Sequence, residues 1–253
     1  MHRIDELVNV VARLRGEGGC PWDLAQTPST MRPYILEETY EVLEAIDRGN
    51  DAELAKELGD MLFHIVMLSQ MGSEREAFDL DSVAARITEK MIRRHPHVFD
   101  PDYVAQEDEG GIAAWEARKA KERDASASAL DGVPSALPSL LRAHRVSEKA
   151  SGVGFDWPDL SGVRDKVREE TAELHEALDS GDPQAITEEL GDVLFSLVNL
   201  GRFLEVGAED ALRQATTRFE ERFMRLEATL TESGRTIHDT DAETLESIWR
   251  AVK

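Results

Sequence analysis

Two stretches of the 253-residue sequence are nearly repeated, and they decide the fold. Residues 37–46, EETYEVLEAI, share six of ten positions with residues 169–178, EETAELHEAL, and residues 56–63, KELGDMLF, share six of eight with residues 188–195, EELGDVLF. Both matches use the same offset of 132 residues. Chance would give roughly one or two identities over such a length, so we infer that a whole structural unit is duplicated. The sequence therefore predicts two related domains.

Apolar residues within each copy recur with the period of an amphipathic helix. In the first repeat, Ile35, Val42 and Ile46 return at intervals of seven and four residues, which places them on one face of a helix. The same period over about residues 80–94 and 208–231 predicts two further helices. Strand-like alternation is scarce along the chain.

Turn residues separate the two helices of each repeat. Residues 47–50 are Asp-Arg-Gly-Asn and residues 179–182 are Asp-Ser-Gly-Asp, which are the residue types that end one helix and begin the next. The two helices of each copy are therefore expected to fold back antiparallel. The predicted fold class is all-α, with two tandem related helical-bundle domains of about four helices each.

A segment rich in Ala, Ser and Pro lies between the copies. Residues 125–139, ASASALDGVPSALPS, have no sustained apolar period and are typical of a linker. The boundary is expected near residue 130. We therefore predict an N-terminal domain over 1–124, a linker over 125–136 and a C-terminal domain over 137–253.

The chain is strongly acidic, with 29 Lys and Arg against 51 Asp and Glu and a formal charge of −22. Such a surface repels phosphate backbones, which argues against nucleic acid as the main partner and means that an acidic ligand would need a metal ion. The single cysteine, Cys20, can form no intrachain disulfide, and the expected location is the cytoplasm. The most apolar stretches are shorter than about 18 residues and contain acids, so no membrane-spanning segment is predicted.

Acidic residues lie toward the inner side of both helices in each repeat. Glu38 and Glu41 are about 60° apart around their helix, and Glu57 and Asp60 form one polar stripe with His64 on a helix that is otherwise apolar. The second copy repeats the four acids as Glu170, Glu173, Glu189 and Asp192. When two helices pack about 8–10 Å apart, the four acids of each copy can converge on one point.

Four adjacent carboxylates require compensation of their charge. Either they hold protons at raised pKa values or a cation lies among them. Oxygen ligands favour a hard ion, so Mg²⁺ is the expected cofactor and Mn²⁺ a possible substitute. Two alternatives are that the acids are ordinary surface charges near helix ends, and that they form a di-iron centre. The second is disfavoured because neither copy contains the Glu-x-x-His pairs of such centres.

The motifs together resemble a known family. The pattern EExxE followed by ELGD occurs twice, with CPWD near the start, RRHPHVFD after the first unit and VGFDW before the second. This arrangement is similar to the two-domain MazG-type nucleoside triphosphate pyrophosphohydrolases over essentially the whole chain. The resemblance implies an all-α fold of the NTP pyrophosphatase type, a homodimer, and Mg²⁺-dependent cleavage of nucleoside triphosphates between the α and β phosphates. The products would be the nucleoside monophosphate and pyrophosphate, and the expected role is the removal of unwanted nucleotides.

The resemblance also assigns roles to residues. The acids that would hold the metal are Glu170, Glu173, Glu189 and Asp192 in the second domain and Glu38, Glu41, Glu57 and Asp60 in the first. Either Glu169 or Glu189 would accept the proton of the attacking water. The positions that correspond to nucleotide contacts are Lys166, Arg218, Arg222, Trp249 and Lys253, with the Trp249 indole as a stacking surface for the base.

The two copies differ in ways that bear on function. Tyr34 stands in the first copy where the second has Lys166, so the first lacks that phosphate partner. The second copy has Ala185 where the family pattern leads us to expect a basic residue. In the family the second unit is the working catalyst, so we expect catalysis in residues 137–253 and doubtful activity in the first domain. The alternative function is a non-catalytic, nucleotide-sensing binding protein.

Overall fold

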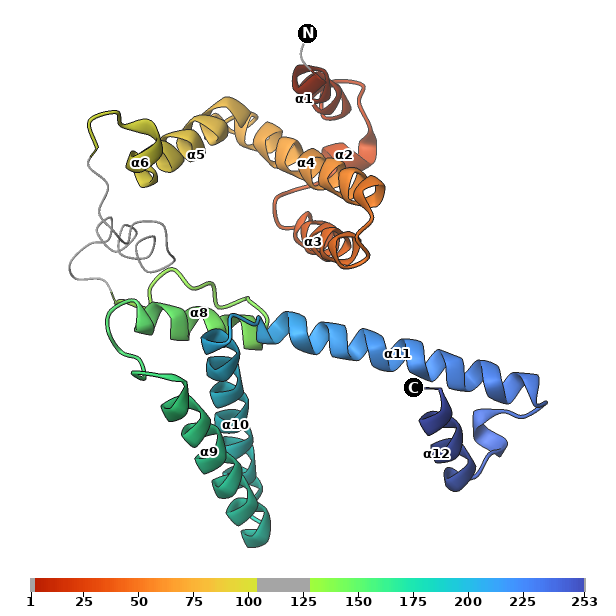
Figure 1. Ribbon diagram of the computed structural model, residues 1–253. Coiled ribbons are helices and arrows are strands. Elements are labelled where there is room, and N and C mark those ends of the chain that lie inside the picture. The colour runs from red at the N-terminus through yellow and green to blue at the C-terminus, as the bar shows by residue number, and fades with distance from the viewer. Residues whose placement is uncertain (1–2, 104–127, 253) are drawn as a thin grey trace. The chain divides into compact units, whose positions relative to one another are not determined.

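The computed structural model describes residues 3–103 and 128–252, and within these ranges every regular element is a helix (Figure 1). The all-α fold class is thereby confirmed. By their internal contacts, the residues divide into two compact units, 1–107 and 108–253. The predicted linker over 125–136 stays a prediction. Its described part, from residue 128 onward, forms turns, and Lys149 donates a hydrogen bond to the carbonyl oxygen of Asp131.

The first unit contains two long helices and several shorter ones. Its helices are α1 (Arg3–Leu14), α2 (Pro21–Ala25), α3 (Arg32–Asp47), α4 (Asp51–Ser73), α5 (Leu80–Arg94) and α6 (Pro96–Phe99). Helices α3 and α4 carry the first repeat and pack against each other as the predicted hairpin, while α1 packs on another part of α4. The bounds of α5 match the helix that the periodicity predicts over 80–94.

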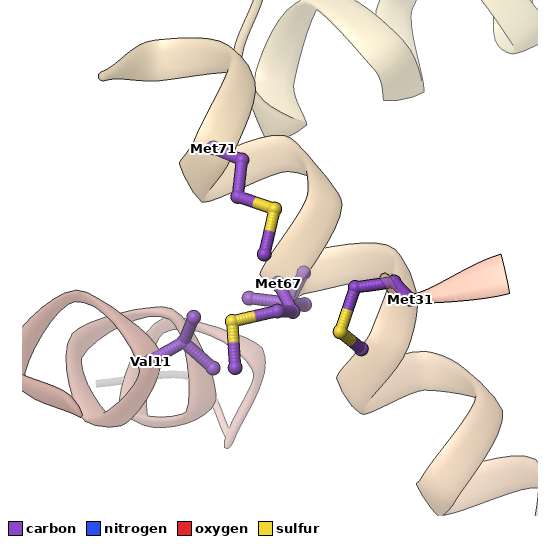
Figure 2. Close-up of a cluster of buried hydrophobic side chains, with 5 residues drawn as sticks. Val11, Met31, Met67 and Met71 are labelled. Atoms are coloured by element: carbon purple, nitrogen blue, oxygen red, sulfur yellow. The ribbon is translucent and has the colours of Figure 1, made fainter. Parts of the chain in front are cut away.

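Methionines make up most of the fully buried core of the first unit. Met31, Met67 and Met71 gather around Val11 of α1, and each of the four is at most 2% exposed (Figure 2). Two of the methionines belong to α4, so this core fixes α1 against the helix that carries Glu57 and Asp60. Unbranched thioether side chains suit such a junction because they adapt to irregular gaps.

The second unit repeats the central hairpin and continues into a long helix. Its described helices are α8 (Ser139–Ser151), α9 (Leu160–Ser180), α10 (Pro183–Phe203), α11 (Ala208–Glu232), the short 3-10 helix η1 (Ile237–Asp239) and α12 (Ala242–Ala251). Helices α9 and α10 lie side by side along most of their length, and α8 packs on α10 (Figure 1). Helix α11 confirms the helix predicted over about 208–231, and α12 packs back on it.

The turn between the two repeat helices has the same chemistry in both units. Gly49 and Gly181, which are equivalent in the repeat, have φ values of 61° and 68°, a left-handed conformation that costs glycine little. The next residues, Asn50 and Asp182, then cap the following helix by accepting hydrogen bonds from its first amides. The predicted helix reversal is therefore confirmed, and its cause lies in the Gly-Asx pair.

None of the helices in the described ranges combines the length and the apolar character that crossing a bilayer requires.

Candidate metal and nucleotide site

Three of the four acids that the sequence predicts to meet in the second repeat converge on one point. Glu170 of α9 and Glu189 and Asp192 of α10 each place a carboxylate oxygen within 4.8 Å of the others. A second overlapping group joins Glu169 and Glu173 to Glu170 with the same spacing. Glu170 is shared by both groups and is only 6% exposed, while Asp192 is exposed at the surface. The cluster is thus a half-buried patch of negative charge between two helices.

Lys166 is a cation that contacts this cluster. Its ammonium lies 2.8 Å from Glu169 Oε1 and 2.6 Å from Glu170 Oε1, one helical turn away on α9. These hydrogen bonds raise the pKa of Lys166 above its ordinary value, so the side chain is a cation at neutral pH. The predicted role of Lys166 as a nucleotide contact stays a prediction, and the structure places this side chain against the acids.

The pKa of Glu173 indicates that Lys166 does not neutralise the whole acidic cluster. Burial and the charge of Glu170 both raise the pKa of Glu173 above its ordinary value, with a smaller contribution from Glu189. Neighbouring carboxylates that cannot all ionise easily form a site that binds a proton or a cation favourably. Because every donor atom is a carboxylate oxygen, the residues present fit a hard divalent ion such as Mg²⁺.

The first repeat forms an equivalent cluster. Glu38 of α3 and Glu57 and Asp60 of α4 place one oxygen each within 4.8 Å of the others. Oε2 of Glu38 and Oε2 of Glu57 are buried and accept no hydrogen bond while the carboxyls are ionised. Glu41 lies beside them, and its pKa is raised by a hydrogen bond with Glu57, by burial and by the charge of Glu57. Unsatisfied buried oxygens are costly, which again fits a bound cation.

Different neighbours surround the acids of the first unit. Tyr34 occupies the position of Lys166, and its ring stacks on His64 and meets Trp22 edge-on, with centroid distances of 6.4 Å and 5.8 Å. His64 Nε2 lies 3.5 Å from Glu38 Oε1, so the polar stripe that His64 shares with Glu57 and Asp60 also meets α3. Sequence reasoning missed one cation here: Lys56 lies 2.9 Å from Glu57 Oε1. The signal was present, since KELGD in the first copy is EELGD in the second.

The remaining predicted nucleotide contacts within the described residues lie on α11 and α12, and Figure 1 shows α12 on the part of α11 that extends away from α9 and α10. The Arg222 guanidinium stacks 3.9 Å from the centre of the Trp249 ring and donates hydrogen bonds to the Trp249 carbonyl oxygen. Phe219 packs against the same indole, with the ring centroids 5.1 Å apart. Arg218 is exposed on α11. The structure therefore gathers Arg222 and Trp249 with each other and does not bring them to the acids, and Lys253 lies outside the described residues.

A comparison with models of known protein families gives a match that fits the fold and the acidic site. A family model described as the MazG nucleotide pyrophosphohydrolase domain matches residues 26–99 and 161–225, the segments that contain the two acidic clusters. The chain belongs to the MazG family.

Curated relatives match the chain from end to end. A protein of Escherichia coli K12 named nucleoside triphosphate pyrophosphohydrolase is 45% identical over 100% of this chain and 98% of its own length. A protein of Thermotoga maritima named nucleoside triphosphate pyrophosphohydrolase/pyrophosphatase MazG is 43% identical over 98% of this chain and 95% of its own length. An uncharacterized Bacillus subtilis protein, YabN, is 38% identical, and the match covers 100% of this chain and 52% of that protein.

Proposed function

We propose that this protein is a Mg²⁺-dependent nucleoside triphosphate pyrophosphohydrolase. It hydrolyses the bond between the α and β phosphates and releases a nucleoside monophosphate and pyrophosphate. One observation carries the proposal: Glu170, Glu189 and Asp192 converge within 4.8 Å on two neighbouring helices. The end-to-end similarity to relatives that carry this activity in their names supports it.

The acids would hold the ion, and the ion would supply charge neutralisation of the substrate phosphates. Glu170, Glu189 and Asp192 form the group that joins the two helices, and Glu173 groups with Glu170 at the same spacing. Mn²⁺ is the natural substitute because it accepts the same oxygen ligands. When the acids hold a cation, the Lys166 ammonium is free to turn from Glu170 toward a phosphate oxygen.

The side chains then direct an in-line displacement at the α phosphorus. A water oxygen attacks phosphorus, the bond from phosphorus to the oxygen that bridges to the β phosphate breaks, and pyrophosphate leaves with that oxygen. The proton of the water passes to a carboxylate, for which Glu169 and Glu189 are the candidates. Glu169 suits this role because its side chain is 56% exposed and can exchange the proton with solvent.

We assign catalysis to the second unit. We place the boundary between the two domains near residue 130. The support is the Lys166 cation, which contacts the acids there and is replaced by Tyr34 in the first unit. The acids of the first unit have the same spacing, and Glu38 and Glu57 each keep a buried oxygen without a hydrogen bond, so we propose that they also bind a divalent ion.

A second copy of the chain is proposed to complete the catalytic site. Helix α10 exposes Leu190, Leu194 and Leu197, whose exposed fractions of 48%, 45% and 43% are high for large apolar residues in one helix. Helix α12, which packs on α11, lies on the part of α11 that extends away from α9 and α10 (Figure 1). A homodimer that covers α10 could bring Arg218, Arg222 and Trp249 of one chain to the acids of the other. The cytoplasmic location and the role in clearing unwanted nucleotides stay predictions.

Product analysis tests the proposed function. The purified protein is incubated with each common NTP and dNTP in Mg²⁺, and products are separated by ion-exchange chromatography. We expect equimolar monophosphate and pyrophosphate, complete loss of activity in EDTA, and recovery on addition of Mg²⁺ or Mn²⁺. Release of single phosphate with a nucleoside diphosphate would contradict the proposed bond, and binding of nucleotides without turnover would favour the nucleotide-sensing alternative.

A further inference from the structure

A buried histidine lies beside the acidic cluster of the first unit. His64 of α4 is 8% exposed, and its Nε2 lies 3.5 Å from Oε1 of Glu38 on α3. It follows Asp60 by four residues and Glu57 by seven, so the three side chains share one face of α4. The three acids that lie close enough to share an ion are Glu38, Glu57 and Asp60, and His64 contacts this group through Glu38.

Packing alone does not account for a histidine at this position. Within the described part of the chain, the buried Nδ1 of His64 has no hydrogen-bond partner, which costs free energy. The equivalent residue of the second unit is Ser196, which is 4% exposed and donates its hydroxyl to the carbonyl oxygen of Val193 at 2.9 Å. A small residue therefore fits this position of the duplicated helix without an unsatisfied atom. The imidazole of the first unit is better explained by the contact of its Nε2.

Aromatic neighbours hold the His64 ring in one orientation. Tyr34 of α3 stacks on it, with the ring centroids 6.4 Å apart and an angle of 28° between the planes, and Phe63 lies against it at 5.6 Å. Trp22 meets Tyr34 edge-on at 5.8 Å. Because contacts with two rings restrict the rotation of the imidazole, Nε2 is kept toward Glu38.

The second unit provides the equivalent glutamate with a different partner. The Lys166 ammonium lies 2.6 Å from Oε1 of Glu170, and both residues belong to α9. Tyr34 stands at the position of this lysine in the first unit, and the nitrogen that faces Glu38 comes from the other helix of the hairpin. Oε1 of the glutamate thus has a nitrogen neighbour in both units. Oε2 of Glu38 is buried without a hydrogen bond among the described residues, which leaves it for an ion.

We propose that His64 is a positioning residue of the metal site of the first unit. Its Nε2 holds Oε1 of Glu38, and Tyr34 keeps the imidazole in place, so that Oε2 is left for the ion. Partners that hydrogen-bond a carboxylate ligand orient it and contribute about 10–100-fold to metal affinity. The inference rests on the divalent ion proposed for the first unit, and it assigns His64 and Tyr34 no part in the hydrolysis of nucleotides.

Mn²⁺ binding to the full chain tests this role. It is measured by electron paramagnetic resonance in a background that carries Glu189→Gln and Asp192→Asn, which remove two acids of the second cluster. His64→Leu and His64→Gln have similar size and differ in their hydrogen-bonding capacity. His64→Leu removes every side-chain N–H, so we expect the Mn²⁺ dissociation constant to rise about tenfold or more. His64→Gln keeps an N–H that can reach Glu38, so the constant should rise less than about threefold.

Further variants separate positioning from packing. Tyr34→Phe keeps the stacked ring and should leave Mn²⁺ affinity unchanged, whereas Tyr34→Ala should weaken binding in the same sense as His64→Leu. If His64→Leu does not fold, as judged by circular dichroism, the comparison of the two Tyr34 variants replaces it. The matched control is Ser196→Ala with Glu57→Gln and Asp60→Asn, which should bind Mn²⁺ as that background does, because the Ser196 hydroxyl bonds to its own helix.

The outcomes distinguish this inference from the proposed function. Equal weakening by His64→Leu and His64→Gln, or no effect of either, would overturn the positioning role. Absence of Mn²⁺ binding to the first unit with His64 in place would overturn both the ion proposed there and this inference. Neither result decides the proposed function, which pyrophosphate release by the wild type tests separately.

Discussion

At the scale of single residues, equivalent acids have different partners in the two repeats. Glu170 is paired by the Lys166 ammonium, whereas Glu38 contacts the His64 ring and keeps one oxygen without a hydrogen bond. The carboxylates themselves are preserved, so the capacity to hold a cation is expected in both units. What differs is the place of the cation that contacts the acids, which is Lys166 on α9 in the second unit and Lys56 on α4 in the first.

This difference predicts unequal effects of matched substitutions. Glu170→Gln keeps the size of the side chain but removes a ligand charge, and we expect kcat/KM for pyrophosphate release to fall on the order of 100-fold or more. The equivalent Glu38→Gln should lower it less than about threefold, a small change on the free-energy scale of mutant kinetics. Circular dichroism of both variants serves as the folding control. The opposite ranking would show that the first unit contains the catalyst.

The sequence was sufficient to predict which acids face one another, because the two acids of each helix are three residues apart and therefore lie about one helical turn from each other. Lys166 was predicted from resemblance, and its contact with Glu170 follows from a separation of four residues. The Arg202–Asp156 pair was not predicted, since Arg202 meets Asp156 across 46 residues of sequence. The Arg222–Trp249 contact likewise depends on how α12 folds back onto α11. Contacts of this kind are set by tertiary packing rather than by local spacing.

At the scale of elements, an ion pair between Arg15 and Glu74 connects the end of α1 to the end of α4 in the first unit. Arg15 Nε and one of its terminal nitrogens donate to the two carboxylate oxygens of Glu74, at 2.8 Å and 2.7 Å. Arg15 also donates to the backbone oxygens of Asp23 and Gln26, which holds the segment around α2 in place. Such a two-pronged pair is stronger and more directional than an ordinary surface pair.

The pair predicts a dependence of stability on pH. The hydrogen bonds from Arg15 hold the pKa of Glu74 below its ordinary value of 4.5, although burial opposes them. A carboxyl with a lowered folded pKa stabilises the protein above pH 4.5, and the stabilisation is lost as the pH falls through the folded pKa. Glu74→Gln should therefore cost about 1 kcal/mol at pH 7, with solvent screening of the partly exposed carboxylate included, or a few degrees in Tm.

Scanning calorimetry at pH 7 and at pH 3 measures this effect. The difference in Tm between the wild type and Glu74→Gln should shrink at the lower pH, because below pH 4.5 the unfolded chain takes up a proton at Glu74 that the folded chain, with its lowered pKa, resists. A difference of the same size at both pH values would show that the pair does not stabilise the unit by charge.

At the scale of the whole molecule, the duplicated helical hairpin is packed differently in the interiors of the two units. The periodicity and the Gly-Asx turns were sufficient to predict the helices and the antiparallel reversal in both copies. They were not sufficient to distinguish Met67, which closes a core, from Asn199, which lines a cavity. Both residues follow the same helical stripe, and only the packing of α1 or α8 onto it decides which space is filled.

Counting bound metal ions tests the central claim most directly. Mn²⁺ is titrated into the wild type and into the matched variants Asp60→Asn and Asp192→Asn, both at exposed positions, and free Mn²⁺ is followed by electron paramagnetic resonance. We predict that each variant binds half as many ions as the wild type, and that only Asp192→Asn loses pyrophosphate release. If Asp192→Asn bound as many ions as the wild type with the same affinity, the carboxylates of α9 and α10 would not be the metal site.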